Sequence, residues 1–152
     1  MRGIRFIAPN RYDKFLCYIF EKVPFEQYTW YVDQTEIIYY DKTIQKASEN
    51  FFNSRIMSGH DFKLAISRED YYVYLANIQA YSVYSPYCTI STYEDFLKSN
   101  CEILLLCADT VDYNIYCKSP PILTQMHSIC KCLFQNVEYI TDENDSRTRL
   151  RL

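Results

Sequence analysis

The run Cys101-Glu102-Ile103-Leu104-Leu105-Leu106-Cys107-Ala108 is the most apolar stretch of the sequence, and the acidic turn Asp109-Thr110 ends it. The next stretch, Val111-Asp112-Tyr113-Asn114-Ile115-Tyr116-Cys117, alternates between apolar and polar residues. A continuous apolar run between turn residues is typical of a strand buried on both faces, and a period of two is typical of a half-buried strand. We therefore predict a central strand over 101–108 and an antiparallel neighbour over 111–117.

The length and composition predict one soluble domain over residues 1–152. The chain has 152 residues, of which 49% are hydrophobic and 23% charged, as in ordinary globular domains. Its longest apolar run, Ile103 to Ala108, is far shorter than the roughly 20 residues of a membrane span. The opening residues, Met1 to Ile7, lack the pattern of a signal peptide. We expect a cytoplasmic protein that does not bind membranes.

The cysteines, histidines and glycines give no sign of a catalytic or metal site. Seven cysteines form an odd number, contain no C-x-x-C and are expected to be reduced thiols, most of them buried. His60 and His127 lie in no recognisable catalytic motif. Gly3 and Gly59 are the only glycines, so the usual phosphate-binding loops are excluded. We predict no catalytic residue, no metal and no cofactor, and an enzyme of unfamiliar type ranks last among our hypotheses.

Hydrophobic spacing and turn residues predict the remaining elements in chain order. They are a strand over Gly3–Ala8, a helix from Tyr12 to Phe20, a hairpin of Tyr28–Val32 and Glu36–Tyr40, a second hairpin of Phe62–Ile66 and Tyr71–Tyr81, a helix opened by a capping box from Ser91 to Glu94 and ending near Asn100, a helix capped by Ser119 and running to Phe134, and a strand over Val137–Thr141.

Two segments leave alternatives open. Between Asp41 and His60 a short helix is one option, because Ile44, Ala47 and Phe51 have helical spacing. The C-terminal segment, residues 142–152, is either a frayed terminus or a final edge strand paired with Val137–Thr141. Strict alternation from Arg147 to Leu152 favours the strand.

This order of elements predicts the fold class. Hairpins predominate, so we expect an α+β domain with a largely antiparallel sheet and about three helices packed on one face. The sixteen tyrosines suit both a half-exposed sheet and a binding surface, because tyrosine buries a ring and keeps a wet hydroxyl. We favour sheet architecture over a tyrosine-lined binding face as the reason for them.

Stretches at both ends carry a family resemblance. The opening RGIRFIAPNRY (Arg2–Tyr12), the pair Tyr28-x-Trp30 and the closing VEYITDENDSRTRL (Val137–Leu150) resemble the Bacillus-type proteins grouped as domain-of-unknown-function family 2691. The opening departs from the family pattern, which has a Glu before Ile-Pro-Asn where this chain has Ile7-Ala8. The resemblance implies a small cytosolic protein of low-GC Gram-positive bacteria with an ordered C-terminal segment. It implies no activity.

The candidate binding residues lie in two places. Asp142, Glu143 and Asp145 put three carboxylates within four residues, and Arg147 and Arg149 follow. A solvated turn, with carboxylates paired to these arginines, is the plainer interpretation. The alternative is a recognition patch in which Arg147 and Arg149 bind a carboxylate or phosphate of a partner.

Trp30 and Tyr31 are the second candidate binding pair. Trp30 is the only tryptophan, and we favour a core position for it over a binding role. As binding residues, both would line an aromatic pocket between the sheet and the helices.

Three function hypotheses remain after these exclusions. The favoured one is a non-enzymatic protein-binding module, for example an immunity or inhibitor-type protein, because aromatic residues and arginine are enriched in interface hot spots. The alternative is a small-ligand-binding domain with the aromatic pocket. The third is the enzyme. A net charge of −3 argues against nucleic acid as a partner.

Overall fold

The computed structural model describes residues 1–43, 45–48 and 50–152, with side chains omitted for residues 41 and 46–48. The elements in chain order are β1 (Gly3–Ile7), α1 (Phe15–Ile19), the 3-10 helix η1 (Phe25–Gln27), β2 (Tyr28–Asp41), β3 (Lys46–Ser48), β4 (Ile56–Ser58), α2 (Gly59–Ile66), β5 (Tyr71–Ser82), α3 (Tyr93–Lys98), β6 (Cys101–Ala108), β7 (Asp112–Cys117), α4 (Pro120–Leu133) and β8 (Gln135–Ile140).

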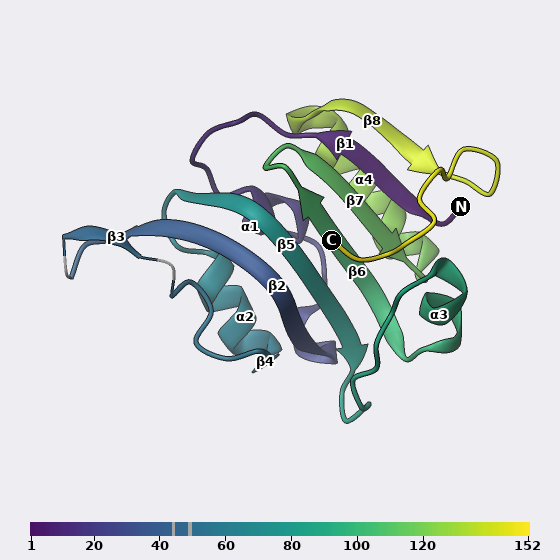
Figure 1. The fold of residues 1–152 in the computed structure, drawn as a ribbon, viewed down its shortest axis with the longest axis horizontal. Coiled ribbons are helices and arrows are strands. Elements are labelled where there is room, and N and C mark those ends of the chain that lie inside the picture. The colour runs from purple at the N-terminus through teal and green to yellow at the C-terminus, as the bar shows by residue number, and fades with distance from the viewer. Residues whose placement is uncertain (44, 49) are drawn as a thin grey trace.

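One open sheet organises the described part of the chain (Figure 1). Its strand order is β3-β2-β5-β6-β7-β1-β8, and β4 pairs with the same edge of β2 as β3 does. Every strand pair is antiparallel. The predicted α+β class with a largely antiparallel sheet is therefore confirmed.

The central hairpin is the predicted one. β6 lies between β5 and β7, and its residues from Ile103 to Cys107 are buried, as expected for a strand covered on both faces. β7 pairs with it in register, with Leu105 opposite Ile115. The chain reverses at Asp109 and Thr110, whose φ angles are 50° and 71°.

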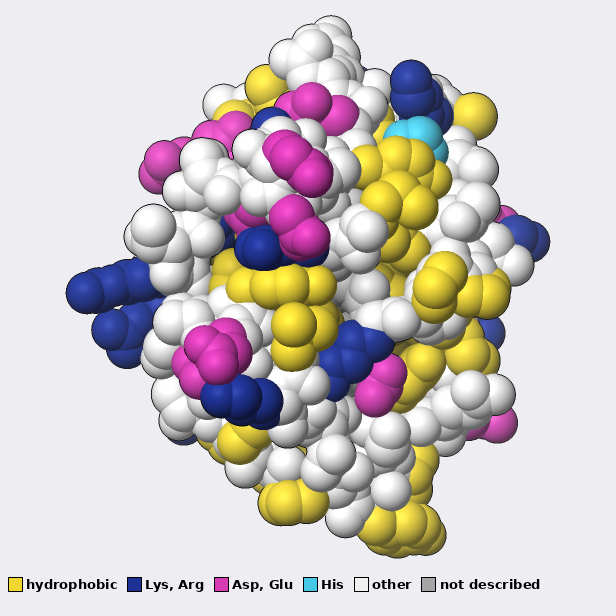
Figure 2. Space-filling model, turned by 90° about the vertical axis from the view of Figure 1, so that its right-hand side faces the viewer, with side chains coloured by type: hydrophobic (Ala, Val, Ile, Leu, Met, Phe, Trp, Pro, Cys, Tyr) yellow, Lys and Arg dark blue, Asp and Glu magenta, His cyan; other side chains and the backbone are white. Residues whose placement is uncertain are grey.

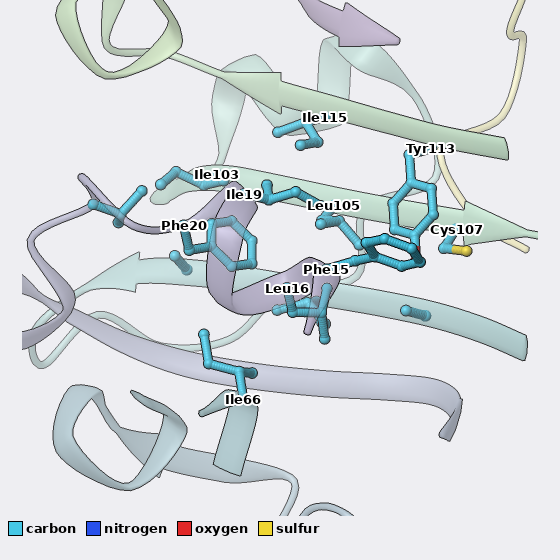
Figure 3. Packing of buried hydrophobic residues seen from close by; sticks show 14 of the residues in the cluster. Phe15, Leu16, Ile19, Phe20, Ile66, Ile103, Leu105, Cys107, Tyr113 and Ile115 are labelled. Atoms are coloured by element: carbon cyan, nitrogen blue, oxygen red, sulfur yellow. The ribbon is translucent and has the colours of Figure 1, made fainter. Parts of the chain in front are cut away.

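The helix face is the face of the sheet that α1, α2 and α4 cover. In Figure 3, Phe15 and Ile19 of α1 point toward apolar side chains of β6 and β7, and Leu16 and Phe20 belong to the same buried cluster. Each such side chain contributes roughly 1.5–3 kcal/mol when it is fully buried. On this face α4 covers the part of the sheet that holds the first and last strands, since it contacts β1, β7 and β8.

The tail face is the opposite face, and α3 and the C-terminal segment, residues 142–152, cover part of it (Figure 1). A second apolar cluster lies here, and it includes Phe96 of α3, Tyr116 of β7 and Leu150 of the C-terminal segment. Three helices pack on one face, as predicted. One of the three is α2, which was not among the predicted helices. The predicted helix that became α3 lies on the tail face.

The predicted hairpin over 28–40 is wrong, because β2 is one strand of 14 residues. The residues expected to form its loop bulge instead of reversing the chain. Gln34 has a φ of 43°, and the β2–β5 register shifts between Asp33 and Glu36. The Thr35 hydroxyl accepts a hydrogen bond from the backbone N–H of Asn77 at 3.2 Å, which holds the bulge against β5.

The predicted strand over Phe62–Ile66 is also wrong, because these residues belong to α2. The side chain of Ser58 caps this helix by accepting a hydrogen bond from the N–H of Asp61 at 3.2 Å. The buried residues Phe62, Ala65 and Ile66 have the i, i+3, i+4 spacing of one helical face. β5 therefore has β2 as its partner in place of the predicted strand.

The helix ends follow the sequence more closely. Ser119 caps α4 as predicted, by accepting a hydrogen bond from the N–H of Ile122 at 3.5 Å. The capping box of α3 is one residue later than predicted and uses Thr92 and Asp95. None of the helices in the described part of the chain has the length and apolar character needed to cross a membrane.

Two segments had alternative predictions. The described part of residues 41–60 contains the strands β3 and β4, and Ile44, one of the three residues whose spacing suggested a helix, lies outside the described residues. The C-terminal segment matches neither of its two predictions, the edge strand and the frayed terminus. It forms no strand, yet it is not frayed, because Leu150 is 1% exposed and its N–H donates to the carbonyl of Ser91 at 2.9 Å.

Candidate binding face

Trp30 lies in the core of the helix face. Its ring stacks on Phe62 with the centroids 4.0 Å apart and the planes 4° apart, and its indole N–H donates to the carbonyl of Phe25 at 3.2 Å. The side chain is fully buried. The favoured core interpretation is therefore confirmed, and Trp30 offers no surface to a partner.

Tyr31 lies on the tail face, because neighbouring residues of a strand point to opposite sides. Its ring stacks on Tyr87 with the centroids 3.7 Å apart, and the guanidinium of Arg55 lies 5.4 Å from the ring centre. Arg55 also pairs with Asp33 at 2.6 Å. Tyr31 thus fixes the loop that follows β5 against the sheet.

The acidic turn of the C-terminal segment is paired with Arg2 and not with the arginines that follow it. Arg2 Nε lies 2.7 Å from Asp142 Oδ1, and Arg2 Nη1 lies 3.1 Å from Asp145 Oδ2. The guanidinium of Arg2 also lies 4.1 Å from the centre of the Tyr93 ring. The hydrogen bond and charge of Arg2 lower the pKa of Asp142. Arg2 therefore joins the start of the chain to its end.

Asp145 is a structural residue in this arrangement. Its side chain is only 3% exposed. Besides Arg2, it accepts hydrogen bonds from the hydroxyl of Tyr116 at 3.2 Å and from the backbone N–H of Arg147 at 3.1 Å. A buried carboxylate needs such partners, because leaving it unpaired in the apolar cluster is costly. Sequence reasoning missed Arg2 and Tyr116, which lie far from Asp145 in the chain.

The other predicted residues of this segment are arranged differently. Glu143 and Arg149 are exposed. The guanidinium of Arg147 donates to the carbonyls of Arg149 and Arg151 at 3.3 and 3.5 Å, so it folds the segment onto itself. Tyr31 and the C-terminal segment share the tail face, whereas Trp30 lies on the other side of the sheet.

A polar groove lies beside the C-terminal segment on the tail face. Its volume is about 650 Å³, and its lining includes Arg5, Asp112, Asn114, Glu138, Ser146 and Arg147. Arg5 Nε lies 2.6 Å from Glu138 Oε1, and Arg5 Nη1 donates to the carbonyl of Asn144 at 3.2 Å. Figure 2 shows one side of the molecule, where acidic and basic side chains lie close to one another.

The tyrosine patch is a group of aromatic and apolar side chains on a part of the tail face that neither α3 nor the C-terminal segment covers. We define it as Tyr12, Ile38, Tyr40, Tyr72 and Tyr74. Tyr40 is 54% exposed, Tyr12 49% and Tyr74 40%. The ring of Tyr72 lies 5.2 Å from that of Tyr12 and 4.6 Å from that of Tyr74, and its hydroxyl donates to the side chain of Asn10. Ile38 lies directly opposite Tyr72 on the neighbouring strand.

Two carboxylates lie on the side of this patch that holds Tyr74. Glu36 precedes Ile38 on the same face of β2, and Asp109 lies in the turn whose Thr110 N–H donates to the carbonyl of Tyr74 at 3.1 Å. Glu36 and Asp109 are exposed, and the described residues give neither of them an ion pair. The patch therefore has apolar rings at its centre and two unpaired carboxylates on the side of Tyr74.

The thiols inside the domain are protonated at neutral pH. Burial raises the pKa of Cys117 to about 11 and the pKa values of Cys107 and Cys130 to about 12. The pKa of Cys101 is raised for the same reason. The described residues contain no group of three or more His, Cys, Asp or Glu side chains that could hold a metal ion. His127 stacks on Tyr139, with the ring centres 4.0 Å apart.

The fold and this face define a small antiparallel α+β domain with helices on one side and an aromatic patch, with two carboxylates beside it, on the other. The family model for proteins of unknown function called DUF2691 matches residues 1–151, so the chain belongs to this family, and the resemblance of its ends is confirmed. It is 31% identical over 150 residues to the uncharacterized protein YncE of Bacillus subtilis (strain 168), covering 98% of this chain and 97% of the relative. No solved structure matches the chain.

Proposed function

We propose that this chain is a protein-binding module whose docking surface is the tyrosine patch. The observation that supports it most is the exposure of Tyr12, Tyr40 and Tyr74 together on the part of the tail face that no helix covers. Grouped apolar surface is uncommon on soluble monomers unless something binds there. Tyrosine is enriched in interfaces because it supplies a large rigid ring and a hydroxyl that can still form a hydrogen bond.

The charge around the patch supports a basic partner over a second copy of this chain. Two copies that met through the patch would each bring Glu36 and Asp109 to the interface, and like charges across an interface are costly. The net charge of −3 acts in the same direction over longer distances. An inhibitor or immunity protein that covers a basic surface of its target is one concrete form of such a module. A toxin or defence gene beside its own gene would support that form.

We propose that the binding takes place in the cytoplasm. All seven cysteines are free, and Cys88 and Cys132 are exposed. Free exposed thiols suit a reducing compartment, where disulfides are rare.

Native mass spectrometry after gentle purification from the organism that encodes the protein tests the proposal. We expect the wild type to carry a co-purifying polypeptide, and the double variant Tyr40→Ser with Tyr74→Ser to lose it. Tyr84→Ser is the matched control, because Tyr84 is 98% exposed and lies outside the patch. It should keep the polypeptide. Retention by the double variant, with all three melting temperatures alike, would contradict the proposal.

Binding of a small polar ligand is a second candidate, and the polar groove beside the C-terminal segment favours it. Its volume of about 650 Å³ lies in the range typical of ligand sites. The same native spectra test it: a reproducible extra mass of a few hundred daltons, lost in Arg147→Ala and kept in the tyrosine variants, would support this second function over the first.

A further inference from the structure

A small hollow at the edge of the tyrosine patch determines what the partner presents there. Resting on the proposed function, we infer that the hollow takes a single lysine or arginine side chain of the partner, held between the carboxylate of Glu36 and the ring of Tyr74. The hollow has a volume of about 350 Å³ and is lined by Thr35, Glu36, Ile37, Ile38 and Tyr74. This is the size of a site for one side chain at the lower end of ligand-site volumes.

Two irregularities of the β2–β5 ladder form this hollow. The register shifts between Asp33 and Glu36 and again between Glu36 and Ile37, so Glu36 lies between two bulges. In the second shift Leu75 pairs with Glu36 and Val73 with Ile37, which leaves Tyr74 without a partner residue on β2. Bulges turn side chains away from their regular positions and are common beside functional sites. Here they bring Glu36 and Tyr74 to the rim of one hollow.

The groups around the hollow select a cationic side chain. The carboxylate of Glu36 is exposed and has no ion pair among the described residues. The ring of Tyr74 offers a face that attracts a cation. Ile38 supplies apolar surface for the methylene stem that lysine and arginine both carry.

Other occupants fit the hollow less well. An anion would meet Glu36 directly, the lining contains no arginine or lysine, and Arg55 is already paired with Asp33 at 2.6 Å. A metal ion would find one carboxylate in the lining, that of Glu36, and the hydroxyl of Thr35 is already engaged: it donates to the carbonyl of Asp33 at 2.8 Å and accepts from the N–H of Asn77 at 3.2 Å. Calcium and magnesium need several oxygen ligands. A neutral apolar side chain would leave the carboxylate unpaired at a contact surface.

Selection from a displayed library of random dodecapeptides on the immobilised protein tests the inference. Peptides are kept only if they bind wild type and lose binding to Tyr40→Ser with Tyr74→Ser. We expect the kept sequences to share a lysine or arginine beside apolar residues. Its replacement by methionine should weaken binding to wild type about tenfold, which is the scale of one close charge contact.

A double-mutant cycle with Glu36→Gln then assigns the cation to the hollow. We expect the same methionine replacement to change the affinity for Glu36→Gln less than about twofold, because the partner of the cation is already gone. Glu26→Gln is the matched control, since Glu26 is exposed on η1 and away from the patch. It should leave the tenfold effect intact.

The outcomes separate this inference from the proposed function. Peptides that need Tyr40 and Tyr74, but whose affinity depends on neither a cation nor Glu36, would overturn the inference and leave the proposed function standing. A library in which no peptide depends on the two tyrosines would overturn both.

Discussion

Leu150 anchors the C-terminal segment to the tail face, and replacing it tests whether the segment is part of the fold. Its side chain is 1% exposed within the second apolar cluster. Leu150→Ala removes three carbons, which at about 0.8 kcal/mol for each buried carbon amounts to about 2.4 kcal/mol. The cavity left behind adds to this, so we expect the free energy of unfolding to fall by about 3 kcal/mol. For a domain of this size the melting temperature should fall by roughly 6–12 °C.

Urea unfolding followed by Trp30 fluorescence measures this loss. Trp30 lies in the core of the helix face, so its emission reports the unfolding of the whole domain rather than local detachment of the segment. Leu97→Ala is the control, because Leu97 is 53% exposed on α3, and such surface changes stay within about 0.5 kcal/mol. If Leu150→Ala behaves like this control, the segment is a solvated terminus and its assignment to the tail face is wrong.

Three further perturbations have expected outcomes. Gly59→Ala should lower the free energy of unfolding by several kcal/mol, seen as a fall in the urea midpoint, because the added methyl would lie 2.1 Å from the carbonyl oxygen of Phe25. Tyr84→Asn should raise the melting temperature slightly, because φ is 70° at this exposed position and asparagine tolerates that region better; a fall would contradict the argument. Alkali should destabilise the domain. Burial raises the pKa of Cys107 to about 12 and the pKa of Cys117 to about 11 in the folded domain. These shifts stabilise the folded domain fully while the pH is below the thiol pKa of the unfolded chain. The stabilisation is lost as the pH rises toward the folded values. Each such thiol changes the free energy of unfolding by about 1.4 kcal/mol per pH unit in that window. A urea midpoint that stays constant from pH 8.5 to 11 would refute this.

The elements that could be predicted are those whose pattern has one structural solution. The apolar run Cys101–Ala108 between turn residues is long enough for a strand and too short for a buried helix, and it is β6. The final helix combines a cap at Ser119, prolines in its first turn and apolar spacing over 14 residues, and it is α4. In both, the local preference and the tertiary environment agree.

The wrong predictions come from signals that two structures share. Asp33-Gln34-Thr35 is a polar stretch between two apolar runs, which suits a hairpin loop and a bulge equally. The structure contains the bulge, because β2 pairs with β5 on both sides of this stretch, from Tyr28 to Tyr39. Phe62–Ile66 is apolar enough for a strand. The signal that could have identified the helix is Ser58 followed three residues later by Asp61, which is a capping pattern.

The C-terminal segment illustrates why site residues are harder to predict than elements. Its acidic turn suggested pairing with Arg147 and Arg149, which lie next to it in the sequence. The structure pairs Asp142 and Asp145 with Arg2, at the other end of the chain. Only the order of strands in the sheet, with β1 between β7 and β8, brings these residues together, and local pattern does not encode that order.

The tyrosine patch was visible in the sequence only as composition. Sixteen tyrosines were assigned mainly to sheet architecture, and Tyr71 and Tyr113 are indeed core residues. Which of the others would be exposed together depends on the pairing register of β2 and β5 and on which part of the tail face the C-terminal segment covers.

Site-specific photo-crosslinking tests the central claim, that a protein partner docks on the tyrosine patch, most directly. Benzoylphenylalanine replaces Tyr40 in the patch. As a control it replaces Leu64, which is 59% exposed on α2 and lies away from the tail face. In the organism that encodes the protein, we expect light to join one discrete polypeptide at position 40 and not at position 64. Excess wild-type protein should compete the adduct away, and the Tyr74→Ser background should weaken it. The same adducts at both positions, or none at position 40, would contradict the claim.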